Sequence, residues 1–73
     1  MYDVKVIYHK DDGGSVVELH PATSVEDDGA CVFVDKDTAS EQRFCYTDPA
    51  ESINRIFITN PSGATVHRAE GVT

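Results

Sequence analysis

The carboxylates that could bind a cation lie close together in one polar segment of this chain. Asp35, Asp37 and Glu41 fall within seven residues, and hard cations such as Ca²⁺ prefer clustered carboxylate oxygens. An EF-hand loop that starts at Asp35 would need Gly at position 40 and Glu at position 46, where the chain has Ser40 and Tyr46. The spacing therefore predicts a solvated hairpin tip and no metal site.

The nitrogen and sulfur ligands that zinc prefers are also present, but they are scattered. Structural zinc sites usually take their ligands from pairs two to four residues apart. His9, His20 and His67 stand far from one another, and neither Cys31 nor Cys45 belongs to such a pair. We expect histidines on strand surfaces and reduced cysteines packed as small apolar groups, with no metal and no cofactor.

Two residue pairs could support catalysis. Arg43 and Cys45 would share one face of a strand, where the guanidinium would favour the thiolate. Glu18 and Glu26 could serve as acid and base, but nothing in the sequence fixes their separation. A chain of 73 residues also has little volume for a substrate pocket. The sequence therefore predicts a protein that is not an enzyme.

Negative charge is concentrated in one part of the chain. Thirteen Asp and Glu against six Lys and Arg give a net charge of −7. Residues 11–41 contain nine acids and one base, a net charge of −8, and the other residues carry +1. Such a surface repels nucleic-acid phosphates and anionic lipid headgroups. We therefore expect no direct binding to nucleic acid and none to membranes.

The acidic turns instead predict a site for a basic protein surface. Clustered carboxylates can imitate a phosphate track and raise the association rate by electrostatic steering. Tyr8 and Tyr46 are added to the predicted site because a tyrosine ring tolerates a partly solvent-exposed position and aromatic residues are enriched at interfaces. Acidity that serves only solubility is the alternative reading. The predicted partner-binding residues are Asp11, Asp12, Glu26, Asp27, Asp28, Asp35, Asp37, Tyr8 and Tyr46.

The profile of a very small, acidic, β-rich chain resembles, as a class, phage-encoded inhibitors such as anti-CRISPR proteins and other nucleic-acid mimics. The resemblance is carried by size and charge, and it implies a non-enzymatic interaction module. Two other classes stay open. One is a structural or assembly module of a virion or larger complex, which binds through sheet edges, for instance as a homodimer. The other is a small-ligand or metal-binding protein.

The elements that hold these residues are predicted to be short antiparallel strands, because the dominant hydrophobic period is two. In residues 15–20 we expect Val17 and Leu19 to face inward, and we expect the apolar run 30–34 at a sheet centre. Glycines at 13 and 14 indicate a hairpin turn. The predicted strands are residues 2–9, 15–20, 30–34, 43–47 and 56–59, with an edge strand over 64–67.

The expected fold is all-β: a five- to six-stranded antiparallel, SH3-like barrel or a strongly twisted sheet, formed by one domain over residues 1–73. Asp48, Pro49 and Glu51 have the spacing of a capping box, which predicts one helical turn near 49–53. Residues 68–73 are expected to fray. The first residues alternate charged and apolar side chains rather than forming the apolar run of a secretory signal, so the chain is expected in the cytoplasm.

Overall fold

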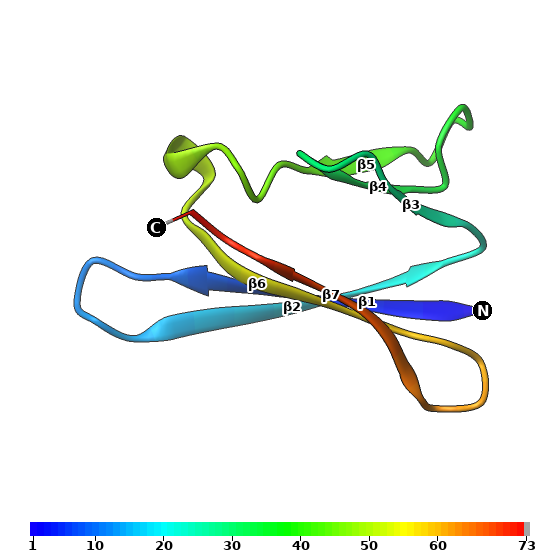
Figure 1. Cartoon of the computed structure of the whole chain (residues 1–73), viewed down its shortest axis with the longest axis horizontal. Helices are drawn as coiled ribbons and strands as arrows, with labels where there is room; N and C mark the ends of the chain where they lie inside the picture. Colours follow the sequence, from blue (N-terminus) through cyan, green and yellow to red (C-terminus); the bar gives the residue numbers. More distant parts are fainter. Residues whose placement is uncertain (73) are drawn as a thin grey trace.

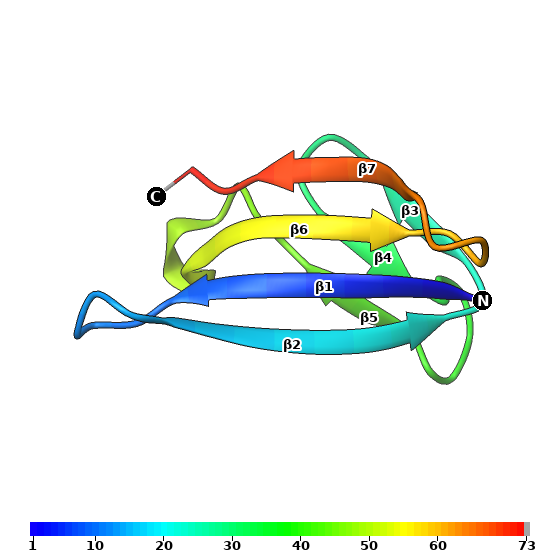
Figure 2. The ribbon, with the colours of Figure 1, turned by 90° about the horizontal axis from the view of Figure 1, so that it is seen from below.

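The computed structural model describes residues 1–72, and these form two antiparallel β-sheets and one turn of 3-10 helix. The larger sheet has the order β2-β1-β6-β7 and the smaller sheet the order β3-β4-β5. The smaller sheet covers one face of the larger one (Figures 1 and 2). The expected all-β, antiparallel fold is confirmed. The strands are β1 (Tyr2–His9), β2 (Ser15–Ala22), β3 (Val25–Asp27), β4 (Val32–Val34), β5 (Gln42–Phe44), β6 (Ile53–Thr59) and β7 (Thr65–Glu70).

The hydrophobic core lies between the two sheets. Alternate residues of β1 face it, as their period of two predicts, and Val4 and Val6 are completely buried. The predicted central strand is the middle strand of the smaller sheet, where Val32 and Val34 are buried. The other core residues are Ala22, Phe44, Ile53, Ile56, Ile58 and Ala69, with Tyr2, Tyr8, Val25 and Tyr46 packed against them.

The two sheets do not close into a barrel. Over residues 1–72, strands pair only within their own sheet, so the larger sheet ends at β2 and β7 and the smaller one at β3 and β5. The three strands of the smaller sheet have three residues each, which is too short to wrap around the core and join the edges of the larger sheet. The architecture is a small two-layer arrangement, and the SH3-like barrel is not confirmed.

The orientation predicted for β2 is wrong. Leu19 and Val17 are 66% and 53% exposed, whereas His20 packs against buried Phe44 with tilted rings whose centroids are 4.7 Å apart. Directly opposed residues of an antiparallel pair share a face, and the partner of Leu19 is the outward-facing Lys5. The register with β1 therefore turns the apolar residues of β2 away from the core.

The prediction of reduced cysteines is also wrong. Cys31 and Cys45 form a disulfide. Val32 of β4 is opposed to Phe44 of β5, so continuing this register by one residue places the two cysteines directly opposite each other. The bridge ties the turn after β3 to the segment that leaves β5.

The predicted helical turn is confirmed at Pro49–Glu51. The carboxylate of Asp48 caps it by accepting from the backbone N–H of Ala50 at 2.9 Å. The Glu51 carboxylate does not complete a capping box, because it accepts from the N–H of Cys45 at 3.3 Å. The helical turn is thus fixed to the end of the smaller sheet.

The C-terminal segment is held along much of its length. Residues expected to fray include the end of β7, where Ala69 is buried. Beyond β7, Gly71 N–H donates to the Asn54 carbonyl at 2.7 Å, and Val72 N–H donates to the Tyr46 carbonyl at 3.2 Å. Position 73 lies outside the described residues.

Candidate functional site

Six of the predicted partner-binding residues lie in or beside the smaller sheet. We call residues 23–47, which comprise β3, β4, β5 and their connections, the acidic layer. It contains six acids and two bases, a net charge of −4 on 25 residues, whereas the other 48 residues carry −3. β4 has three residues, so the turns at its two ends are roughly 10 Å apart. The members of the predicted set in this layer are Glu26, Asp27, Asp28, Asp35, Asp37 and Tyr46.

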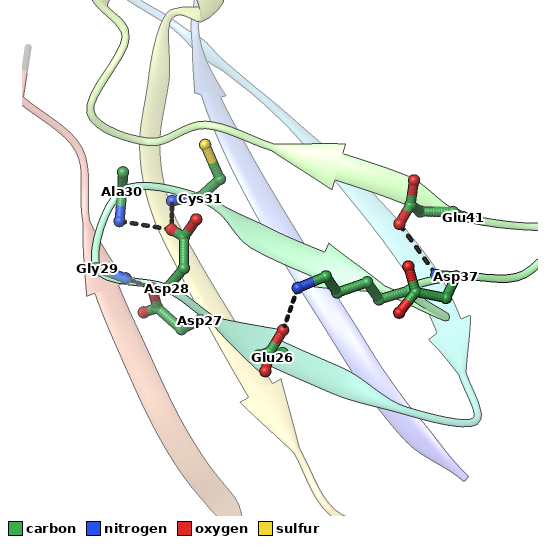
Figure 3. A network of polar contacts seen from close by, with 9 residues as sticks. Glu26, Asp27, Asp28, Gly29, Ala30, Cys31, Asp37 and Glu41 are labelled. Atoms are coloured by element: carbon green, nitrogen blue, oxygen red, sulfur yellow. Dashed lines mark hydrogen bonds and ion pairs between the residues drawn. The ribbon is translucent and has the colours of Figure 1, made fainter.

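Two aspartates of the acidic layer hold the turns at opposite ends of β4. The Oδ1 atom of Asp28 accepts from Ala30 N–H at 2.9 Å and from Cys31 N–H at 2.8 Å (Figure 3). Oδ1 of Asp35 accepts from Thr23 N–H and Ser24 N–H at 2.7 and 3.0 Å. In both residues, Oδ2 has no hydrogen-bond partner within the described part of the chain. Each carboxylate is thus fixed in place and keeps one oxygen available.

Backbone hydrogen bonds also stabilise the charge on Asp28. The N–H groups of Cys31 and Ala30 lower the pKa of this carboxyl below its ordinary value. Asp28 therefore stays ionised at neutral pH.

On the outer face of the acidic layer, the Lys36 side chain contacts both Glu26 and Phe33. Lys36 Nζ lies 2.9 Å from Oε2 of Glu26 and 5.0 Å from the centre of the Phe33 ring. The hydrogen bond and charge of Glu26 raise the pKa of Lys36. Beyond it, Glu41 accepts from the N–H of Asp37 at 3.1 Å (Figure 3). Glu26 is thus already paired, whereas the Asp37 carboxylate has no ion pair or hydrogen bond within residues 1–72.

Asp27 faces the interior side of the acidic layer and differs from its neighbour Asp28. Its Oδ1 accepts from Gly29 N–H and from the Tyr46 hydroxyl, both at 2.8 Å. Its Oδ2 lies 2.6 Å from Nε2 of His67 in β7. Asp27 therefore links the smaller sheet to the edge of the larger one.

The hydrogen bonds of Asp27 also control its ionisation and that of Tyr46. Burial raises the pKa of Asp27, but hydrogen bonds from Gly29, His67 and Tyr46 outweigh it, so the pKa lies below the ordinary value of 3.8. Burial and the bond to Asp27 raise the pKa of Tyr46 to about 12. At neutral pH the carboxylate is charged and the phenol is neutral.

An open cavity of about 370 Å³ lies beside Asp27, between β3 and β7. A bulge in β7 helps to form it. Ile58 pairs with His67 and Thr59 pairs with Thr65, which leaves Val66 as an extra residue, and bulges of this kind redirect side chains. The lining residues are Tyr2, Val25, Asp27, Ile58, Val66 and His67.

The remaining predicted residues lie away from the acidic layer. Asp11 and Asp12 form the tip of the long β1–β2 hairpin, which projects from the far end of the larger sheet (Figures 1 and 2). Asp12 accepts from Gly14 N–H at 2.8 Å and lies 3.6 Å from Lys10. Tyr8 packs against the core, and burial together with Glu18 raises its pKa to about 12. The acidic turns therefore do not all converge.

The sequence predicts only a surface position for His67, whereas the structure places it in the wall of the cavity, where it contacts Asp27. The two residues are 40 positions apart, and the strand order that joins them was not readable from the sequence. Residues 64–67 alternate apolar and polar side chains without interruption, so the bulge at Val66 has no signal in the sequence.

Among residues 1–72 there is no group of three metal-ligating side chains. In the same part of the chain, no helix has the length and apolar character needed to cross a membrane. The chain matches no protein family, no curated protein and no solved structure.

Proposed function

We propose that this protein is a non-enzymatic interaction module that binds a basic protein surface through its acidic layer. The observation that carries the proposal is the hydrogen bonding of the Asp28 and Asp35 carboxylates. Each carboxylate is fixed by two backbone N–H groups through Oδ1, and each leaves Oδ2 without a partner in the described chain. Fixed acceptors lose little conformational entropy when a Lys or Arg binds them.

The placement of the charges supports the same function. The Asp28 and Asp35 turns stand at the two ends of β4, roughly 10 Å apart. This distance is close to the screening length at physiological ionic strength, so the two ends act on an approaching partner together. A basic groove of a nucleic-acid-binding protein is a surface of the required charge, and this module would occupy it as a mimic of phosphates, as phage-type inhibitors do.

The disulfide bears on where such a module would act. The alternating first residues predict a cytoplasmic location, whereas the bridge between Cys31 and Cys45 favours an oxidising compartment. Disulfides persist mainly in oxidising compartments. We therefore propose that the module meets its partner outside a reducing cytoplasm.

The test is the affinity for a defined basic polymer, poly-L-lysine, over a series of salt concentrations. The variants Asp28→Asn and Asp35→Asn are combined, because Asn keeps the Oδ1 acceptor that holds each turn but removes the charge. We expect binding about tenfold weaker and less salt-dependent than in the wild type, since exposed ion pairs contribute roughly 0.2–1 kcal/mol each and are screened by salt. Unchanged affinity and salt dependence in a folded double variant would overturn the proposal.

The exposed apolar residues of the edge strand β2 favour a second candidate, an assembly module that associates with a second copy as a homodimer. This strand is an edge of the larger sheet, and its exposed Val17 and Leu19 lie on the face that the smaller sheet does not cover. Exposed apolar edge strands are templates for pairing with another chain. If this function holds, sedimentation should show self-association that resists high salt and is lost in Leu19→Lys, whereas poly-L-lysine binding should not change.

A further inference from the structure

The cavity between β3 and β7 combines apolar walls with one negative group. Tyr2, Val25, Ile58 and Val66 line it, and their side chains can contact an apolar ligand group. Asp27 lies in the wall with a side chain that is 15% exposed, hydrogen-bonded to His67. The cavity has no Lys or Arg among its lining residues. Its chemistry therefore fits a side chain with an apolar stem and a positive end.

The hydrogen bonds of Asp27 limit how a cation can bind it. An ionised carboxylate offers about four acceptor positions, two on each oxygen. Oδ1 already accepts from Gly29 N–H and from the Tyr46 hydroxyl, and Oδ2 accepts from His67. One position on Oδ2 remains. A single donor can use it, but a guanidinium that needs both oxygens cannot.

We propose that this cavity is the binding pocket for one lysine side chain of the basic partner. The methylene stem lies against Val25, Ile58 and Val66, as long cationic side chains commonly cover apolar surface. The ammonium group donates to the remaining position on Oδ2 of Asp27. This inference rests on the proposed function, since it assigns one partner residue to a defined place beside the acidic layer.

The direct test uses three small probes: the N-acetyl, C-methylamide forms of lysine, arginine and norleucine. Each is titrated into the wild-type protein, and the amide NMR signals of Val25, Asp27, Ile58 and Val66 are followed. We expect the lysine probe to shift these signals and the norleucine probe to bind about tenfold more weakly, because it lacks a charge-assisted hydrogen bond. Arginine should bind more weakly than lysine. Equal binding of all three probes, or no shift at these residues, would overturn the proposal.

A variant that fills the cavity provides the second measurement. Val66 is 54% exposed, so Val66→Trp can place a large ring over the cavity without opening the core. The control is Val17→Trp, at a valine of similar exposure on the opposite face of the sheet. Val66→Trp should remove the shifts caused by the lysine probe, and Val17→Trp should leave them unchanged. Persistence of the shifts in a folded Val66→Trp variant would contradict a site in this cavity.

Poly-L-lysine binding separates a failure of this inference from a failure of the proposed function. If the lysine probe does not bind but poly-L-lysine still depends on Asp28 and Asp35, the pocket is wrong and the interaction module stands. If neither binds, both are wrong.

Discussion

Asp27 and Asp28 are adjacent in the chain, yet their carboxylates have different roles. Asp28 holds its own turn and keeps one oxygen without a partner in the described chain. Asp27 connects the two sheets by accepting from Tyr46 and His67. Alternation along β3 explains the difference, because Asp27 points toward the larger sheet while Asp28 begins the turn. Two adjacent residues of one type thus fix different parts of the fold: Asp28 holds its turn, and Asp27 joins the two sheets.

The sheet-to-sheet role of Asp27 predicts a loss of stability in acid. Its pKa in the folded protein lies below 3.8, so the unfolded chain takes up a proton at a higher pH than the folded one. The contribution is complete above pH 3.8 and falls as the pH drops through the folded value. Urea unfolding at several pH values should show this decline, and Asp27→Asn should flatten it. A decline of the same size in Asp27→Asn would mean that other groups cause it, and Asp11→Asn is the matched charge control.

Among the elements, the disulfide links the residue before β4 to the residue after β5, directly beyond the paired residues of the smaller sheet. The cysteines are separated by 14 positions. In the chain-entropy model, a cross-link that closes a loop of this length restricts the unfolded chain and stabilises the folded protein by about 3 kcal/mol. The double variant Cys31→Ser, Cys45→Ser should be destabilised by about this amount in chemical unfolding. Reductant should destabilise the wild type and leave the variant unchanged. A wild type that is indifferent to reductant would contradict a structural role for the bridge.

The C-terminal segment lies directly against β6 at Gly71, whose N–H donates to the Asn54 carbonyl, so a side chain at this position should destabilise the protein. A Cβ atom at this position would overlap the carbonyl oxygen of Ile53, which is backbone and cannot move aside freely. Gly71→Ala should therefore lower the free energy of unfolding by roughly 1–3 kcal/mol, the usual cost of forcing extra atoms into a packed site. The control is Val72→Ala, since Val72 is 58% exposed and surface substitutions usually change stability by less than about 0.5 kcal/mol. Equal melting temperatures for the two variants would show that the segment is not held as described.

The elements also show which parts of this fold a sequence can reveal. Local signals predicted the hairpin at Gly13, where φ is +85°, and the helical turn capped by Asp48. They failed for β2, because its alternation is compatible with either face and only the register with β1 decides between them. The disulfide and the contact between Asp27 and His67 depend on strand pairing and on the packing of the two sheets. These long-range relations have no local sequence signal.

Across the whole molecule, the predicted acidic residues fall in two separate places, the acidic layer and the tip of the β1–β2 hairpin. The acidic layer covers one face of the larger sheet, and the opposite face carries Lys5, Arg55 and Arg68 with exposed Val17 and Leu19. The two remaining acidic residues of the predicted set lie at the hairpin tip, away from the acidic layer (Figure 2). Composition predicted the acidic character, but only the topology separates one acidic layer from a distant acidic tip.

Two triple variants of equal net charge show whether a basic partner binds the acidic layer in particular. One carries Asp28→Asn, Asp35→Asn and Asp37→Asn in the acidic layer, and the other carries Asp3→Asn, Asp11→Asn and Asp12→Asn on the larger sheet and its hairpin. The affinity of each for poly-L-lysine is measured at one moderate salt concentration, after its folding has been checked by circular dichroism. We expect about tenfold weaker binding for the first variant and near wild-type binding for the second. Equal losses in both would show that net charge alone attracts the polymer and would contradict a binding surface in the acidic layer.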